Sequence, residues 1–101
     1  MLDREFFLGF IKIHILYHAV KEPIFGVAIA TELARHGYNV SPGTLYPVLH
    51  RLEHEGYLES SSRVVNGRAR KYYQATAAGK QALRQSKKKI RELVTEVIEG
   101  K

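Results

Sequence analysis

The dipeptide Asn66-Gly67 constrains the fold of this 101-residue chain more than any other feature of its sequence. Both central residues of a type I′ turn need a positive φ angle, which asparagine and glycine adopt most readily. Beyond Gly56 the apolar pattern loses its helical spacing, and the segments 57–64 and 69–75 are typical of strands. The sequence therefore predicts one β-hairpin with its tip at Asn66-Gly67.

Residues 4–20 have the pattern of a first helix, which Glu22-Pro23 ends because the residue before a proline is pushed out of the α region. A helix that is apolar on much of its circumference needs burial on two sides. We expect one side to face the chain's own core and the other to face a second subunit. The apolar residues are Phe6, Phe10, Ile13 and Tyr17 in one stripe, with Phe7, Leu8, Ile11 and Ile15 around it.

Two shorter helices are predicted next. The second runs from about residue 26 to residue 36 and is followed by Gly37, which suits a left-handed C-terminal cap. The third begins after Ser41, a good N-cap, and continues to about residue 55. The residues expected to face the core are Val27, Ala30, Leu33 and Ala34 in the second helix, and Leu45, Val48, Leu49 and Leu52 in the third.

A last helix is predicted from Thr76 to about residue 99. Its apolar stripe contains steps of seven residues, which suggest a seam between helices. The stripe consists of Leu83, Ile90, Leu93, Val94, Val97 and Ile98. The sequence thus predicts a mainly α fold with a small β-hairpin, a winged helix-turn-helix with N- and C-terminal dimerisation helices. The residues expected at the dimer interface are Phe6, Phe7, Phe10, Leu83, Ile90, Val94 and Val97.

Basic residues concentrate in the predicted hairpin. The formal net charge is +6, and a basic excess favours polyanionic partners. Positions 63–71 contain Arg63, Arg68, Arg70 and Lys71 but no acidic residue. Strand alternation places Arg68 and Arg70 on one face and Lys71 on the other. A hairpin made soluble by its charges is the alternative, but unbalanced bases favour a DNA-binding wing with Asn66 at its tip.

The third helix has the features of a DNA-recognition helix. Such a helix presents its N-terminal residues to base edges and phosphates, and hydroxyl groups there suit phosphate contact. An ordinary capped amphipathic helix is the alternative. Pro47 argues against it, because a proline inside a helix removes a hydrogen bond and suggests a local requirement on shape. The residues expected to contact DNA here are Ser41, Thr44, Tyr46, Pro47, His50 and Arg51.

Other classes of site are excluded or disfavoured. Without cysteine the chain has no disulfide, thiolate zinc site or cysteine nucleophile. It has no glycine-rich phosphate loop and no serine-hydrolase motif, so we expect neither enzyme activity nor a cofactor. Two histidine pairs have the i, i+4 spacing that can bind a metal ion, but neither has a clear third ligand. These pairs are His14 with His18 and His50 with His54. The first apolar stretch is too short and too polar to span a bilayer, so a cytoplasmic protein is expected.

The motifs together resemble the PadR family of transcriptional regulators. The resemblance is carried by residues 41–53, 55–58 and 67–73, followed by Thr76 and Gly79, and it covers about residues 6–83. It implies a winged-helix homodimer that binds a palindromic operator, usually as a repressor. It places Thr44, Tyr46 and Pro47 in or beside the major groove. It also implies that Arg68, Arg70 and Lys71 hold phosphates or reach the minor groove.

Some short members of that family bind flat aromatic drugs between tryptophans at the dimer interface. This chain has no tryptophan. An aromatic effector pocket could instead form from Phe6, Phe7, Phe10 and Tyr17, which equally suit the core.

Two functions remain open at this point. The first is sequence-specific binding of double-stranded DNA by a two-fold dimer, with residues 1–75 as the winged-helix domain and residues 76–101 as the dimerisation helix of the same compact unit. The second is a protein-interaction or ligand-sensing module that does not recognise DNA, because a fold alone does not define a function. Salt-sensitive binding to a duplex would distinguish them.

Overall fold

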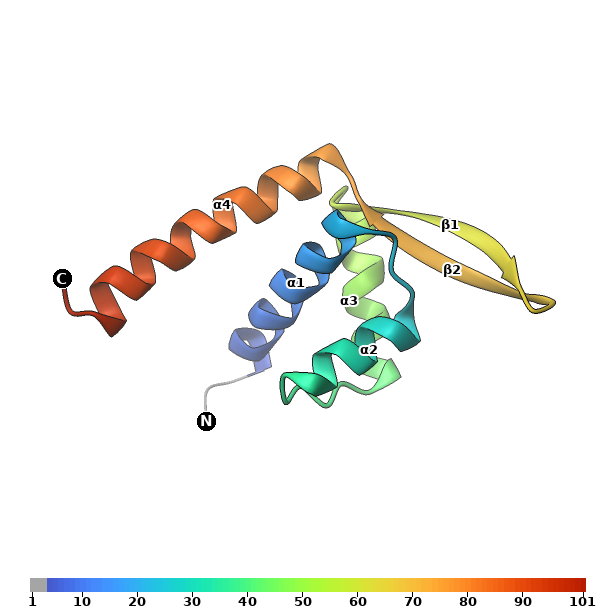
Figure 1. The fold of residues 1–101 in the computed structure, drawn as a ribbon, viewed down its shortest axis with the longest axis horizontal. Coiled ribbons are helices and arrows are strands. Elements are labelled where there is room, and N and C mark those ends of the chain that lie inside the picture. The colour runs from blue at the N-terminus through green and yellow to red at the C-terminus, as the bar shows by residue number, and fades with distance from the viewer. Residues whose placement is uncertain (1–3) are drawn as a thin grey trace.

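The computed structural model describes residues 4–101, which form four α-helices and one hairpin that extends to the right in Figure 1. The helices before the hairpin are α1 (Arg4–Lys21), α2 (Gly26–Arg35) and α3 (Pro42–His54). The hairpin consists of β1 (Leu58–Val65) and β2 (Arg68–Ala75), and it leads into α4 (Ala77–Leu93) and a π-helical segment η1 (Val94–Ile98). The predicted order of elements is confirmed, and only the π-helical end was not expected.

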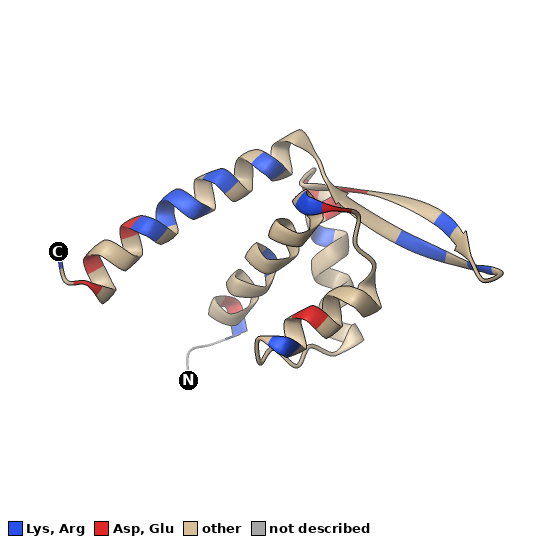
Figure 2. Cartoon of the chain, viewed as in Figure 1, with Lys and Arg blue, Asp and Glu red and all other residues tan. Residues whose placement is uncertain are grey.

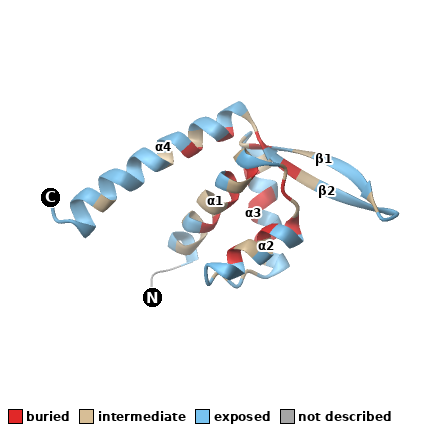
Figure 3. Cartoon of the chain, viewed as in Figure 1, coloured by how far each residue is buried: buried red, intermediate tan, exposed pale blue. Residues whose placement is uncertain are grey.

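The core lies between α1, α2, α3 and the base of the hairpin (Figure 3). The inner face predicted for α3 is confirmed, because Leu45, Val48, Leu49 and Leu52 are all buried. The prediction for α2 is wrong in part. Val27 is 70% exposed and Ala34 is exposed, whereas Ile29 is buried together with Leu33. The inward stripe begins at Gly26 and passes through Ile29 and Leu33, which places Val27 about 100° away from it around the helix.

Helix α1 buries only one of its two apolar sides within the chain. Ile11, Ile15, Leu16 and Ala19 lie in the core. The stripe of Phe6, Phe10 and Tyr17 remains exposed. The prediction of a helix with a second apolar side that its own core does not cover is therefore confirmed for the single chain.

The hairpin turn has the predicted conformation. Asn66 and Gly67 have φ angles of 52° and 77°, and the antiparallel register closes with Val65 opposite Arg68. A short third partner was not predicted: the N–H of Ile24 donates to the carbonyl of Tyr73 at 2.8 Å, and the N–H of Tyr73 donates back at 2.7 Å. This bridge attaches the chain just before α2 to the edge of the hairpin.

Helix α4 starts at the base of the hairpin and projects away from the other helices (Figure 1). The Thr76 hydroxyl caps it by accepting a bond of 3.0 Å from the Gly79 N–H, and it also donates to the carbonyl of Gly56. Gly79 lies so close to the carbonyl of Tyr57 that a Cβ would overlap it. Among residues 4–101, no helix is long and apolar enough to cross a membrane.

Candidate nucleic-acid interface

The outer face of α3 presents the residues predicted to contact DNA. Ser41 is the N-cap residue, but its side-chain oxygen accepts no capping bond from a backbone N–H of α3, and its hydroxyl donates to the Thr44 hydroxyl at 3.3 Å. Pro47 lies inside the helix and cannot donate to the carbonyl of Gly43. Five of the six predicted residues are exposed, and Thr44 is half-buried. The first turns of α3 therefore offer a polar surface that the chain itself does not cover.

Tyr46 is the predicted contact residue whose position the fold determines most closely. Its ring lies against Gly26 at the start of α2, where a Cβ would stand 2.7 Å from Cζ of the tyrosine. Tyr46 is 39% exposed, and its ring centroid lies 6.4 Å from that of His50. The absence of a side chain at Gly26 therefore lets Tyr46 lie in the groove between α2 and α3.

Arg51 lies one turn further along α3. Its Nε is 4.0 Å from Oε1 of Glu55, while the arginine side chain is 71% exposed. Exposed pairs of this kind contribute about 0–1 kcal/mol, so the guanidinium can leave Glu55 for a phosphate at small cost.

The hairpin and the first turn of α3 lie on the side of the molecule away from the C-terminal end of α4 (Figure 1). Contacts at the start of α2 connect them. The ring of Tyr46 rests on Gly26, and the guanidinium of Arg70 lies 4.2 Å from the ring centroid of the preceding residue, Phe25. The predicted recognition helix and the predicted wing thus meet through two consecutive residues.

The outer half of the hairpin is strongly basic (Figure 2). Arg63, Arg68 and Arg70 are exposed. The predicted alternation of faces is confirmed for Lys71, whose Nζ lies 3.6 Å from Oε1 of Glu53 on α3. The hydrogen bond from the Ser60 hydroxyl, together with the charge of Lys71, lowers the pKa of Glu53. Lys71 is therefore partly neutralised within the chain, and the arginine face carries most of the free positive charge.

The first histidine pair lies between α1 and α2. The rings of His14 and His36 stack with centroids 4.9 Å apart, while Nε2 of His18 and Nε2 of His36 lie 3.8 and 3.7 Å from Oε1 of Glu32. Burial lowers the pKa of His14, and the nearby His36 and His18 lower it further. Within residues 4–101 no three histidine, aspartate or glutamate side chains are arranged to hold a metal ion.

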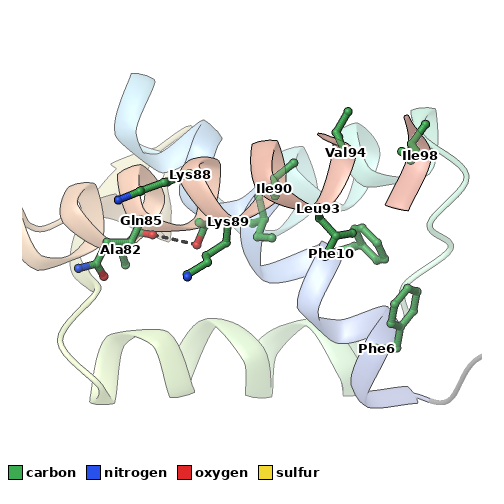
Figure 4. Close-up of a pocket in the computed structure, with 12 residues that line it drawn as sticks. Phe6, Phe10, Ala82, Gln85, Lys88, Lys89, Ile90, Leu93, Val94 and Ile98 are labelled. Atoms are coloured by element: carbon green, nitrogen blue, oxygen red, sulfur yellow. Dashed lines mark hydrogen bonds between the residues drawn. The ribbon is translucent and has the colours of Figure 1, made fainter. Parts of the chain in front are cut away.

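The uncovered apolar side of α1 faces a groove along α4 (Figure 4). The groove has a volume of about 930 Å³ and is lined mainly by apolar side chains. Four residues predicted for the dimer interface line this groove: Phe6, Phe10, Ile90 and Val94. Its lining also includes Ile13, Leu93 and Ile98, which were not in that prediction. Val97 is exposed beside it. Large exposed apolar patches on soluble proteins mark interaction sites.

Two residues predicted for the dimer interface lie elsewhere in the single chain. Leu83 is buried in the chain's own core, and Phe7 packs against that core with its ring 5.1 Å from that of Tyr38. Neighbouring helical positions differ by about 100° in direction, so Phe7 cannot share the groove side with Phe6. Leu83 lies near the start of α4, where the helix still touches the helical core.

Two aromatic residues near the arginines were missed in the sequence. Phe25, just before α2, and Tyr72 of β2 are half-buried, and their rings meet edge to face with centroids 5.4 Å apart. Strand alternation could have indicated Tyr72, because it follows Arg70 by two positions and therefore lies on the same face of the strand. No local sequence pattern could have indicated Phe25, because the β-bridge between Ile24 and Tyr73 brings it next to the hairpin.

Comparison with known proteins places the chain in a family. Residues 15–85 match the family described as Transcriptional regulator PadR-like family. The chain belongs to this family. It is therefore a transcriptional regulator and not an enzyme, and the resemblance drawn from the Ser41 and Gly67 motifs is confirmed.

Individual PadR-like proteins are similar over nearly the whole chain. The transcriptional regulator Rv3488 of Mycobacterium tuberculosis is 52% identical over 97 residues, which cover 96% of this chain and 91% of that protein. A crystal structure of a PadR-like regulator from Bacillus cereus has a TM-score of 0.84 at 31% identity, covering 94% of each chain. A PadR family regulator from Eggerthella lenta has a TM-score of 0.82 at 33% identity, covering 94% of this chain and 84% of that one. These likenesses support the winged-helix fold.

Proposed function

We propose that this PadR-like regulator binds double-stranded DNA sequence-specifically as a homodimer on a palindromic operator and acts as a repressor. The observation that carries the proposal is the junction at the start of α2. There Tyr46 of α3 and Arg70 of the hairpin rest on the consecutive residues Gly26 and Phe25. One continuous exposed surface thus combines a polar helix with a cationic ribbon, the pair of elements that a winged helix applies to a duplex.

The residues divide into three groups by the contacts that we propose for them. Thr44, Tyr46 and Pro47 lie in or beside the major groove, and His50 extends that surface by one turn. Ser41 and Arg51 contact phosphates near the helix. Arg63, Arg68 and Arg70 bind phosphates from the wing or reach the minor groove, with Asn66 at the tip and Lys71 as a weaker contributor because of Glu53.

Dimerisation is the second part of the proposal. The groove between α1 and α4 is apolar, and Leu93 at its edge is 59% exposed. A second copy that covers this surface through a two-fold axis would repeat the DNA-binding surface, with recognition helices about 34 Å apart. Replacing Leu93 with glutamate is expected to shift the protein from dimer to monomer in sedimentation velocity. A variant that sediments as wild type would contradict this interface.

Selection of duplexes from a random pool tests DNA recognition directly. We expect inverted half-sites separated by about one helical turn. A variant with Tyr46→Ala should bind the selected duplex less tightly while its affinity for random DNA changes little. A variant with Arg68→Ala should reduce the slope of log affinity against log salt by about one unit for each copy of the chain on the duplex. The matched control for the salt slope is Arg84→Ala on α4, which should have the slope of the wild-type protein. A pool without enrichment would refute sequence-specific binding.

Repression is tested by transcription in vitro from a promoter that overlaps the selected operator. We expect transcript yield to fall with added protein and to recover in the Tyr46→Ala variant. An increase in transcript would instead show that the protein is an activator.

An aromatic effector is a candidate ligand for the same groove, because Phe6 and Phe10 lie at its edge with ring centroids 4.9 Å apart. Flat aromatic compounds can be screened by their own fluorescence, since the chain has no tryptophan. Binding that is lost in the Phe10→Ala variant would support such a site. Binding that persists unchanged in this variant would place the compound elsewhere.

A further inference from the structure

The outer face of the hairpin holds two arginines directly opposite each other. In the register of β1 and β2, Arg63 is the cross-strand partner of Arg70. Like charges at such positions repel and destabilise a hairpin. In the part of the chain that the structure describes, neither guanidinium lies within ion-pair distance of a carboxylate. The chain thus carries a concentrated positive charge on this face that it does not neutralise.

Each arginine instead lies over an aromatic ring. The guanidinium carbon of Arg70 is 4.2 Å from the ring centroid of Phe25, and that of Arg63 is 4.5 Å from the ring centroid of Tyr72. The two rings contact each other edge to face, with an interplanar angle of 67°. We call these four residues the arginine–aromatic cluster. Its members come from β1, β2 and the segment before α2, so the tertiary fold assembles it.

The rings fix side chains that would otherwise be mobile. Arginine has large rotamer entropy, and ordering one flexible side chain at an interface weakens binding measurably. A cation over an aromatic face is attracted by the ring quadrupole, and its outer edge remains free to donate hydrogen bonds. Planar guanidinium groups match the geometry of a phosphodiester anion. The cluster therefore has the chemistry of a preformed dication for a phosphate backbone.

We propose that Phe25 and Tyr72 are positioning residues for DNA binding, because they hold Arg70 and Arg63 as one ordered dication that contacts the phosphodiester backbone. The inference rests on the proposed function, and it adds two uncharged residues to the proposed DNA-binding site. Their effect on DNA is exerted only through the arginines that they hold.

A double-variant cycle tests this role. The probe is a fluorescein-labelled random-sequence duplex of about 30 base pairs, long enough for two half-sites. Its affinity is measured by anisotropy over a range of salt concentrations. Arg70→Ala should reduce the salt slope by about one unit for each bound copy of the chain, because each copy loses one phosphate contact. Phe25→Leu should weaken binding about threefold to tenfold and leave the slope unchanged, because both charges remain. In the Arg70→Ala background, Phe25→Leu should have no further effect.

Two controls separate positioning from folding. Phe25→Tyr keeps an aromatic face under Arg70 and should bind as tightly as wild type. The melting temperature of Phe25→Leu is the second control, and it should show that this variant is folded at the assay temperature. If Phe25→Leu does not fold, the same cycle is run with Tyr72→Leu and Arg63→Ala.

Two outcomes would overturn the inference. One is that Phe25→Leu weakens binding equally with and without Arg70. The other is that Phe25→Tyr binds as weakly as Phe25→Leu. If the wild-type protein shows no salt-dependent binding to the duplex, the proposed function itself fails. If the protein binds but the effects of the two substitutions are additive, only the positioning role fails.

Discussion

Replacing Gly26 with alanine should impair DNA discrimination while leaving the fold nearly intact. An added Cβ would stand 2.7 Å from Cζ and 2.9 Å from Cε1 of Tyr46. Carbon atoms in contact lie about 3.5–4.0 Å apart, so the ring must retreat by roughly 0.8 Å or more. Because the ring is part of a half-exposed side chain rather than backbone, it can move outward.

The expected effect on stability is small. A tyrosine forced away from its preferred rotamer costs about 0.5–1.5 kcal/mol. Alanine in place of glycine stabilises a helix by about 0.5 kcal/mol, which offsets part of this cost. The free energy of unfolding should therefore change by about 1 kcal/mol or less. The expected effect on recognition is larger, because a lost base contact reduces discrimination by about 1–3 kcal/mol, or about fivefold to 150-fold.

Two measurements on the same variant separate these effects. Thermal denaturation reports stability, and anisotropy reports the ratio of affinities for the selected operator and a scrambled duplex. Gly9→Ala in α1 is the matched control, because a Cβ there meets nothing within 4 Å. Unchanged discrimination in Gly26→Ala would refute the role given to Tyr46. A large loss of stability with equal losses of operator and random binding would show that the glycine serves the fold instead.

Three further changes test packing and titration. Gly79→Ala should destabilise the protein by about 1–3 kcal/mol in urea denaturation, because its Cβ would overlap the backbone carbonyl of Tyr57, which cannot turn away. Leu49→Ala should cost about 2–5 kcal/mol, because this side chain is fully buried in α3, and a smaller loss would indicate that the core collapses around the gap. Burial lowers the pKa of His14 in the folded state, so its stabilisation is complete above pH 6.5 and is lost as the pH falls below that value. The drop in urea midpoint between pH 7.5 and 5.5 should therefore be smaller in His14→Gln than in wild type. An equal drop would show that His14 does not contribute to the pH dependence of stability.

The sequence was most informative where structure depends on local chemistry. The turn at Asn66-Gly67 was predictable because few other residues adopt two consecutive positive φ angles. The inner face of α3 was predictable because its leucines and valine repeat at helical spacing between a clear start and end. The outward residues of α3 followed from the same periodicity. Whether they contact bases remains a prediction, since periodicity gives direction and not a partner.

Prediction failed where a residue's surroundings come from distant parts of the chain. In α2 the first inward position is a glycine, which contributes no apolar signal, so the pattern was assigned one position away at Val27. Leu83 fits the seven-residue repeat of α4 but lies where that helix still touches the core. A periodic stripe shows that a helix has an apolar face. It does not show where along the helix the chain's own core ends.

The start of α2 links the two halves of the proposed DNA-binding surface. Tyr46 from α3 rests on Gly26, Arg70 from the wing rests on Phe25, and the peptide bond between these two residues fixes their spacing. The adjacent Ile24 is hydrogen-bonded to Tyr73, so this segment cannot shift without breaking the bridge. The proposed recognition helix and the wing are therefore joined through one hydrogen-bonded segment, so a change in its conformation would alter both.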